Sequence, residues 1–338
     1  MHLGDYTREQ SLAYLAERTG LDDPGGARQV ADALGDLPLA LAQAAGVITA
    51  QHLTYHRYLD KLTDTTLTAA LPPTPGYPRR LPEAVLLSVQ TAALAHPHAR
   101  AALGLLSVLD PTGITRTLLT DLLDTVVEDH LTVDDADEVI GILARASLIT
   151  FTADNTAVVM HRLIGRTLRE THPDPDEILT TAAQALQHAL PGADAPPPPA
   201  GLVDDIAAQT LTLLGHPTHP DTSADVTQVA TTVGIWLYRV GAYTAMVTIN
   251  EQTLATRERV LGPEHPATLN SRNNLAGGYW AVGRHQDAIT LNEQTLATRE
   301  RVLGPEHPAT LNSRNNLANG YQAVGRHDDA DRLDAPPS

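Results

Sequence analysis

The sequence predicts a mostly helical chain of several domains that ends in an α-solenoid. Two segments, residues 250–288 and 292–330, are identical at 36 of 39 aligned positions. Apolar residues make up 42% of the 338 residues but include a single Phe, so the cores must be built mainly from Leu, Ala, Val and Ile. Leu and Ala favour helix because they lose little rotamer freedom there. A helical hairpin repeated in tandem buries its apolar face only by stacking on its neighbours, which produces a solenoid.

Each repeat is predicted to form two helices. Apolar residues recur at helical spacing from Leu269 onward, a turn follows at Gly283, and a second amphipathic helix carries Ala288. Gly262 suits the position just after the end of the preceding helix. A degenerate earlier copy is visible at the same offset, with Gly241 aligned to Gly283.

The spacing Asn274-Leu275-Ala276-x-x-Tyr279-x-x-x-Gly283-x-x-x-x-Ala288 resembles the tetratricopeptide (TPR) pattern. The offset of 42 residues and the linker Gly262-Pro263-Glu264-His265-Pro266 are similar to the kinesin-light-chain variety of this repeat. The resemblance covers residues 230–334 and implies an array that binds a protein or peptide partner.

Residues 1–65 are predicted to form a small helical unit. The expected helix boundaries are a capping box at Thr7 and Gln10, ends at Gly20 and Gly35, and starts at Pro24 and Pro38. A proline-rich break at residues 71–78 separates this unit from the next segment, because proline lacks the backbone N–H and restricts its predecessor. A second break lies at residues 196–199.

Residues 83–171 are predicted to combine helices with one hairpin. The helices are expected near 83–95, 98–109, 115–123 and 135–146, and the two strands at 147–151 and 156–160. Helices followed by a two-stranded wing describe a winged helix.

Two short motifs resemble those of NB-ARC proteins, a branch of the signal-transducing (STAND) ATPases. Residues 34–41, Leu-Gly-Asp-Leu-Pro-Leu-Ala-Leu, are similar to the family's Gly-Leu-Pro-Leu motif, and Arg18-Thr19-Gly20 precedes it as in the family. Residues 160–164, Met-His-Arg-Leu-Ile, resemble the Met-His-Asp motif, with Arg162 in place of the aspartate. The resemblance implies an NB-ARC helical subdomain at 1–65, a proline-rich linker at 66–82, a winged helix at 83–175, a helical connector at 176–229 and TPR repeats at 230–334.

By this resemblance, Pro38 packs against the adenine of a bound nucleotide and His161 contacts the β-phosphate of ADP. The alternatives are an ordinary first helical position for Pro38 and a structural histidine at a strand-to-helix junction. A phosphate-binding loop needs a lysine after its second glycine, and the single lysine, Lys61, has no glycine beside it. The chain alone is therefore expected to hold no cofactor, and ADP or ATP only if a P-loop core is supplied.

Composition and charge argue against several other functions. A net charge of −17 argues against nucleic-acid binding, which relies on Lys and Arg at phosphates, and the acidic helix start at 134–138 would repel DNA. No apolar run approaches the ~18 residues of a membrane span. Residues 1–6 lack the features of a secretory signal, so we expect a cytoplasmic protein.

No catalytic or metal-binding arrangement is visible, so the chain is predicted not to be an enzyme. Cysteine is absent, and no Ser/His/Asp set or His-Glu-x-x-His motif occurs. His265, His285, His307 and His327 recur with the repeat, but equivalent positions in stacked helices lie about 8–10 Å apart. That spacing is too wide for a shared zinc ion with ligands at about 2.0–2.1 Å.

In TPR arrays the first helix of each repeat lines a concave groove, and the resemblance implies that asparagines there bind the backbone of an extended peptide. An amide both donates and accepts hydrogen bonds, which suits that task. The candidate groove residues are Asn270, Asn273, Asn274, Trp280, Asn312, Asn315, Asn316 and Gln322, with Gly277 and Asn319 in the same stripe, and Arg272 and Arg314 as candidate contacts to carboxylates. The alternative is that these asparagines cap helices or form a solvated face.

The sequence therefore favours the non-enzymatic regulatory and sensing part of a STAND-type signalling protein. Its TPR array would bind a protein or peptide, and its helical and winged units would contribute to an ADP-bound switch. The alternatives are a stand-alone TPR adaptor without nucleotide control and a winged-helix transcription regulator; self-association also remains open. The alanine-rich composition, with arginine far in excess of lysine, points to a bacterial source.

Overall fold

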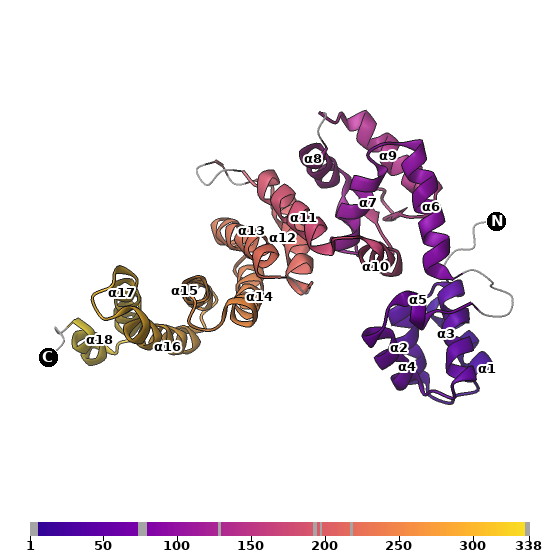
Figure 1. The fold of residues 1–338 in the computed structure, drawn as a ribbon. Coiled ribbons are helices and arrows are strands. Elements are labelled where there is room, and N and C mark those ends of the chain that lie inside the picture. Colours follow the sequence, from indigo (N-terminus) through magenta and orange to yellow (C-terminus); the bar gives the residue numbers. More distant parts are fainter. Residues whose placement is uncertain are drawn as a thin grey trace. The chain divides into compact units, whose positions relative to one another are not determined.

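The computed structural model describes residues 6–73, 80–127, 130–191, 195–196, 198–216 and 219–334. The chain forms two compact units, Met1–Pro175 and Asp176–Ser338 (Figure 1). The predicted proline-rich breaks at 71–78 and 196–199 fall partly outside the described residues. Residues 1–5 and the last four residues, 335–338, also lie outside them.

The first unit begins with five helices. They are α1 (Arg8–Thr19), α2 (Pro24–Leu34), α3 (Pro38–Ala50), α4 (Tyr55–Asp64) and α5 (Leu67–Ala70). The capping box at Thr7 is confirmed, since its side chain accepts from the Gln10 N–H and the Gln10 side chain accepts from the Thr7 N–H. The predicted helix ends at Gly20 and Gly35 are also confirmed, at φ of 68° and 60°. Pro24 and Pro38 each occupy the first helical position, where a missing N–H costs nothing.

The rest of the first unit is helical around a small sheet. Its elements are α6 (Leu81–Ala95), α7 (Ala99–Val108), β1 (Ile114–Thr115), α8 (Arg116–Val126), α9 (Val133–Arg145), β2 (Thr150–Phe151), β3 (Ala157–Val159) and α10 (Arg162–Thr171). The strand order is β1-β3-β2, with both pairings antiparallel. Ile114 and Phe151 therefore both pair with Val158 of the central strand.

The hairpin is confirmed, but the first strand is shorter than predicted. Ser147 has a positive φ of 58°, and the Leu148 N–H donates to the Leu143 carbonyl. These residues therefore close α9 and do not begin a strand. The third strand, β1, was not predicted, because two residues are too few to show the alternation of apolar and polar side chains that indicates a strand.

Helix α10 ties the sheet-containing part to the N-terminal helices. Arg166 donates to the carbonyls of Leu62 and Thr65 at 2.8 and 2.6 Å. Glu170 accepts from the Leu67 N–H at 2.8 Å and from Arg166 at 2.6 Å. Two side chains of α10 thus form hydrogen bonds with backbone carbonyls at the end of α4 and with a backbone N–H at the start of α5.

The second unit is an array of antiparallel helices in which α12 to α18 each contact the next (Figure 1). Its helices are α11 (Pro175–Ala189), α12 (Ala200–Gly215), α13 (Pro220–Arg239), α14 (Tyr243–Leu261), α15 (Pro266–Ala281), α16 (His285–Leu303), α17 (Pro308–Ala323) and α18 (His327–Asp334). The two-helix repeat predicted from the sequence is confirmed. Pro266, the last residue of the linker, is also the first residue of α15.

A buried arginine joins three helices in each repeat. Arg299 of α16 donates to the Ala309 carbonyl and Ser313 Oγ of α17, at 3.0 and 2.7 Å, and to Asn270 Oδ1 of α15 at 2.7 Å. Arg257 does the same between α15 and α13 one repeat earlier. Arg299 is 2% exposed and all the acceptors in its printed hydrogen bonds are uncharged, so hydrogen bonds must offset the loss of water around its charge.

We expect Arg299→Ala to destabilise the second unit by about 3 kcal/mol, because it removes charge-assisted bonds and leaves buried acceptors without partners. Arg301→Ala is the matched control on the same helix, since Arg301 is 61% exposed in its ion pair with Glu264; we expect a loss below about 1 kcal/mol. Denaturant unfolding followed by tryptophan fluorescence measures both, because Trp236 and Trp280 lie in this unit. Equal losses would contradict the bridging role of Arg299.

Candidate functional site

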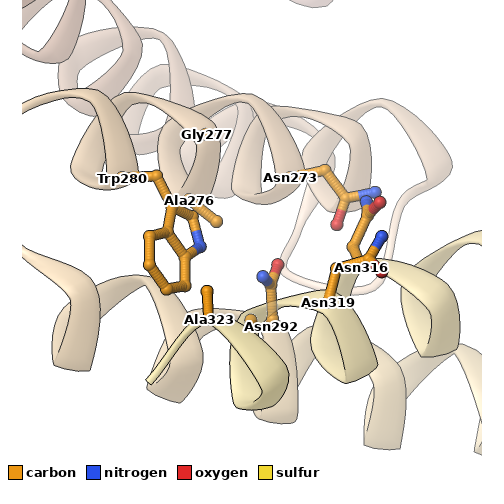
Figure 2. A pocket seen from close by; sticks show the side chains of 9 residues that line it. Asn273, Ala276, Gly277, Trp280, Asn292, Asn316, Asn319 and Ala323 are labelled. Carbon is orange, nitrogen blue, oxygen red and sulfur yellow. The ribbon is translucent and has the colours of Figure 1, made fainter. Parts of the chain in front are cut away.

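A groove lies between α15 and α17, with α16 beneath it (Figure 2). Its volume is about 340 Å³. The lining residues are Asn273, Ala276, Gly277 and Trp280 of α15, Asn292 of α16, and Asn316, Asn319, Gly320 and Ala323 of α17. The first helices of two consecutive repeats thus supply most of the groove lining.

The two ends of the groove differ in chemistry. Figure 2 shows the amides of Asn273, Asn316 and Asn319 gathered at one end and the indole of Trp280 with Ala323 at the other. The indole stacks on the His285 ring, with centroids 4.4 Å apart and planes at 28°. A Cβ on Gly320 would lie 3.2 Å from Trp280 Cζ2, so a glycine lets α17 approach the ring.

Asn292 forms the floor of the groove, and its side chain has no hydrogen-bond partner among the described residues. The residue is 4% exposed, and its amide points up between α15 and α17 (Figure 2). In the preceding repeat the equivalent Asn250 donates to the Asn274 carbonyl at 3.4 Å. Asn273 Oδ1 is buried in the groove and also has no partner within the described chain. A buried polar group without a partner costs about 1–3 kcal/mol, so a ligand that donates a hydrogen bond to Asn273 Oδ1 would remove this cost.

The structure brings together only part of the predicted set. Asn273, Trp280 and Asn316 line the groove. Asn270 instead accepts from Arg299. The remaining predicted amides are exposed but do not line the groove: Asn274, Asn312, Asn315 and Gln322.

The predicted arginines already have carboxylate partners within the chain. Arg272 pairs with Glu258 at 2.7 Å and Arg314 with Glu300 at 2.8 Å, each 14 residues earlier on the preceding helix. Sequence reasoning placed Asn319 in the stripe but missed Asn292, since Asn292 comes from the second helix of the repeat. A search for a polar residue at a buried repeat position would have found it.

Among the residues that the structure describes, no charged side chain lines the groove. The nearest buried cation, Arg299, lies behind the wall, where burial lowers the pKa of its guanidinium. Outside the lining, burial together with a hydrogen bond to Glu293 raises the pKa of Tyr321 to about 12. The groove therefore presents neutral amides and one aromatic ring at every ordinary pH.

In the first unit, His161 contacts the turn that precedes Pro38. Its Nδ1 accepts from the Leu163 N–H at 3.1 Å, so the ring proton is on Nε2, which donates to the Gly35 carbonyl at 3.1 Å. Both ring nitrogens are thereby engaged. A Cβ on Gly35 would overlap the His161 ring, so this glycine is needed for the contact as well as for its positive φ.

The repeat histidines have structural positions. His265 and His307 cap α15 and α17, each accepting from a backbone N–H two residues later. In the part of the chain that the structure describes, no three His, Asp or Glu side chains are arranged to hold a metal ion. No helix within the described ranges has the length and apolar character needed to cross a membrane.

Two family models match parts of the chain. A tetratricopeptide repeat model matches residues 225–301 and 274–334, and a domain of unknown function (DUF7779) matches residues 91–178. No curated protein matches the chain. The second unit thus contains tetratricopeptide repeats, a class of helical repeat that generally mediates contacts between proteins.

Solved structures that match the chain include other repeat proteins. A variant of a Podosopora anserina protein with nearly identical TPR-like repeats of kinesin-light-chain type is 25% identical, over 59% of this chain and 84% of that one, with a TM-score of 0.36. BtubC (BKLC) from P. vanneervenii is 15% identical, over 75% and 94%, with a TM-score of 0.33. A STAND protein with a tetratricopeptide repeat sensor from Pyrococcus horikoshii is 10% identical, over 98% and 59%, with a TM-score of 0.23.

We expect Gly35→Ala to weaken the first unit more than Gly20→Ala does. Both glycines have positive φ. A Cβ added at Gly35 would collide with the side chain of His161, whereas a Cβ added at Gly20 would meet nothing within 4 Å. Backbone strain of about 1–2 kcal/mol is common to both variants, and the collision adds about 1–3 kcal/mol at Gly35 alone. Hydrogen-exchange mass spectrometry over residues 24–50 and 157–171 measures the difference.

A second substitution isolates the contact. In the His161→Ala background the collision is absent, so Gly35→Ala should cost no more than Gly20→Ala. A large difference that persists without His161 would show that the turn is strained for another reason.

Proposed function

We propose that the second unit binds an extended segment of a partner protein or peptide in the groove between α15 and α17. The observation that carries this proposal is the side chain of Asn292, which is buried at the groove floor, points into the groove and has no partner within the described chain. An extended peptide backbone presents an N–H and a C=O at each residue. A side-chain amide matches both groups, because it offers donors and an acceptor.

The arrangement of the other amides supports the same function. Asn273 and Asn316 lie in equivalent turns of α15 and α17, the first helices of two successive repeats. The distance between the two side chains is therefore set by how the repeats stack and not by the geometry of a single helix. A strand lying in the groove would meet Asn292 at the floor and the amides of Asn273 and Asn316 gathered at one end (Figure 2). Such a strand would also satisfy Asn273 Oδ1, which is buried without a donor from the described residues.

The test is selection of binders from a random dodecapeptide phage library with the full chain as bait, followed by affinity measurement on synthetic peptides. Asn292→Ala and Asn273→Ala should each weaken binding by about tenfold, since each removes a bond to a buried amide worth about 1–1.5 kcal/mol. Gln294→Ala is the control, because it removes an exposed amide from α16 outside the groove lining. Peptides whose affinity is unchanged in both asparagine variants would contradict the proposal.

We propose a second function for the first unit, as the helical and winged-helix part of a STAND-type switch. The order α7, β1, α8, α9 and the β2–β3 hairpin supports a winged helix. The contact between His161 and Gly35, three residues before Pro38, supports the switch, because it joins the two motifs that carry the resemblance. With both nitrogens of His161 engaged, the ring has no donor for a phosphate in this structure, so no nucleotide contact is derived from it.

An ADP titration followed by thermal unfolding tests this second proposal. The chain has no lysine in a phosphate-binding loop, so the wild type alone should show no rise in Tm with ADP. His161→Ala should lower the Tm of the first unit without ADP, since it removes the bond to Gly35. A rise in Tm with ADP in the wild type would mean that nucleotide binds without a P-loop core, contrary to the proposal.

A further inference from the structure

The two near-identical repeats differ where the groove is lined. They differ at three of 39 aligned positions. The first copy has Gly277, Trp280 and Gln286 where the second has Asn319, Gln322 and Asp328. Gly277, Trp280 and Asn319 all line the groove. The buried arginine and its acceptors on the following helix, an alanine carbonyl and a serine hydroxyl, are identical in both copies. Two of the three differing positions therefore place a residue on the concave surface, where Trp280 also packs against the neighbouring apolar cluster.

The same two positions also vary in the helix before them. At the same offset of 42 residues, α13 carries Ile235 and Tyr238, which are 54% and 57% exposed. The pair of positions thus reads Ile and Tyr in α13, Gly and Trp in α15, and Asn and Gln in α17. The pair becomes amides in α17, which is otherwise nearly identical to α15, whereas α13 differs from α15 at the other aligned positions as well.

We propose that these two positions determine which side chain of the partner each repeat accepts. This inference rests on the proposed binding function and adds a class of ligand to it. Between α15 and α17 the groove takes an uncharged extended segment that places a large apolar side chain against Trp280. The backbone of that segment lies against Asn273, Asn292 and Asn316.

The space beside Trp280 supports an apolar side chain at that position. Gly277 has no side chain, and a Cβ built on it would meet nothing within 4 Å, so the space at Gly277 is open. The other residues at this end, Ala276 and Ala323, are small and apolar. Burying an apolar side chain against such a surface is favourable by about 25 cal/mol for each Å² removed from water.

The charges around the groove support a neutral segment. A carboxylate or ammonium group in the groove would lose water without meeting an opposite charge, which is strongly unfavourable. Arg272 and Arg314, the cations on these two helices, are held by Glu258 and Glu300. At the equivalent positions of the next repeat, Asn319 and Gln322 would accept a polar side chain in place of an apolar one.

Capped amino acids are suitable probes, since each carries one side chain between two backbone amides. N-acetyl-phenylalaninamide, N-acetyl-glycinamide and the 1-amide of N-acetyl-aspartate are titrated into the labelled full chain and followed by NMR. The signals are the Trp280 indole N–H and the side-chain amides of the groove; Trp236 is 1% exposed and serves as an internal reference. The phenylalanine probe should bind about tenfold more tightly than the glycine probe, and the aspartate probe no more tightly than glycine.

The matched variant exchanges the two positions for the residues of the next repeat. Gly277→Asn with Trp280→Gln introduces side chains that α17 already carries at the same places, so the fold accommodates them. In this variant the preference for phenylalanine over glycine should fall below about twofold. The side-chain amide signals follow binding there, and the glycine probe should bind as it does to the wild type.

Failure of this inference is distinguishable from failure of the binding function. Equal affinity for the three probes, no binding of the phenylalanine probe, or a preference retained in the double variant would each overturn the specificity assignment. The binding function would still stand if the library-selected peptides lost affinity on Asn292→Ala. Weaker binding of all three probes to Asn292→Ala, with the order of preference kept, is the result expected if the floor residue contacts backbone.

Discussion

The array depends on one buried cation in each repeat. Arg299 is fixed to two helices at once, so it sets the distance between α15 and α17, which are the two walls of the groove. Its acceptors are carbonyl, hydroxyl and amide oxygens, and a guanidinium has enough donors in one plane to reach them all. A lysine would offer a single point of charge with no fork. Removing the side chain would leave the buried Ser313 hydroxyl without this donor and break the bond to Asn270, which makes the spacing of the repeats specific as well as stable.

The same bond explains why one predicted groove residue has another role. Asn270 begins the asparagine stripe in the sequence, but its oxygen is occupied by Arg299. Stripe spacing alone does not show this, because the arginine is 29 residues away on the next helix. The helix boundaries, by contrast, were predictable from local chemistry: Thr7 with Gln10, Gly20, Gly35 and the two prolines act through neighbouring residues. Asn292 and the β1 strand escaped prediction because their positions are set by packing between segments distant in sequence.

In the first unit, α10 has the corresponding role. His161 at its start, Arg166 in its middle and Glu170 near its end contact backbone groups of the N-terminal helices. All three contacts are directional bonds to backbone groups, so α10 fixes orientation more than it adds buried apolar area. The motif resemblance singled out His161 but did not predict that its partner is the carbonyl of Gly35. The sequence indicates a positive φ at Gly35, but it does not show that the missing side chain also leaves room for the imidazole ring.

Near-identity of the repeats separates structural from functional positions without any comparison between proteins. A residue needed for stacking must be the same in each copy, because each copy packs against the next in the same way. A residue that faces a ligand meets a different part of that ligand in each repeat and is free to differ. Gly277, Trp280 and Asn319, which differ between the copies and line the groove, meet the second condition. Asn273 is identical to its equivalent Asn315, and Asn292 to its equivalent Asn250, as expected of residues needed for stacking. Both Asn273 and Asn292 nevertheless line the groove. An invariant amide beside a variable pair is the arrangement expected where every repeat binds the backbone in the same way and each selects its own side chain.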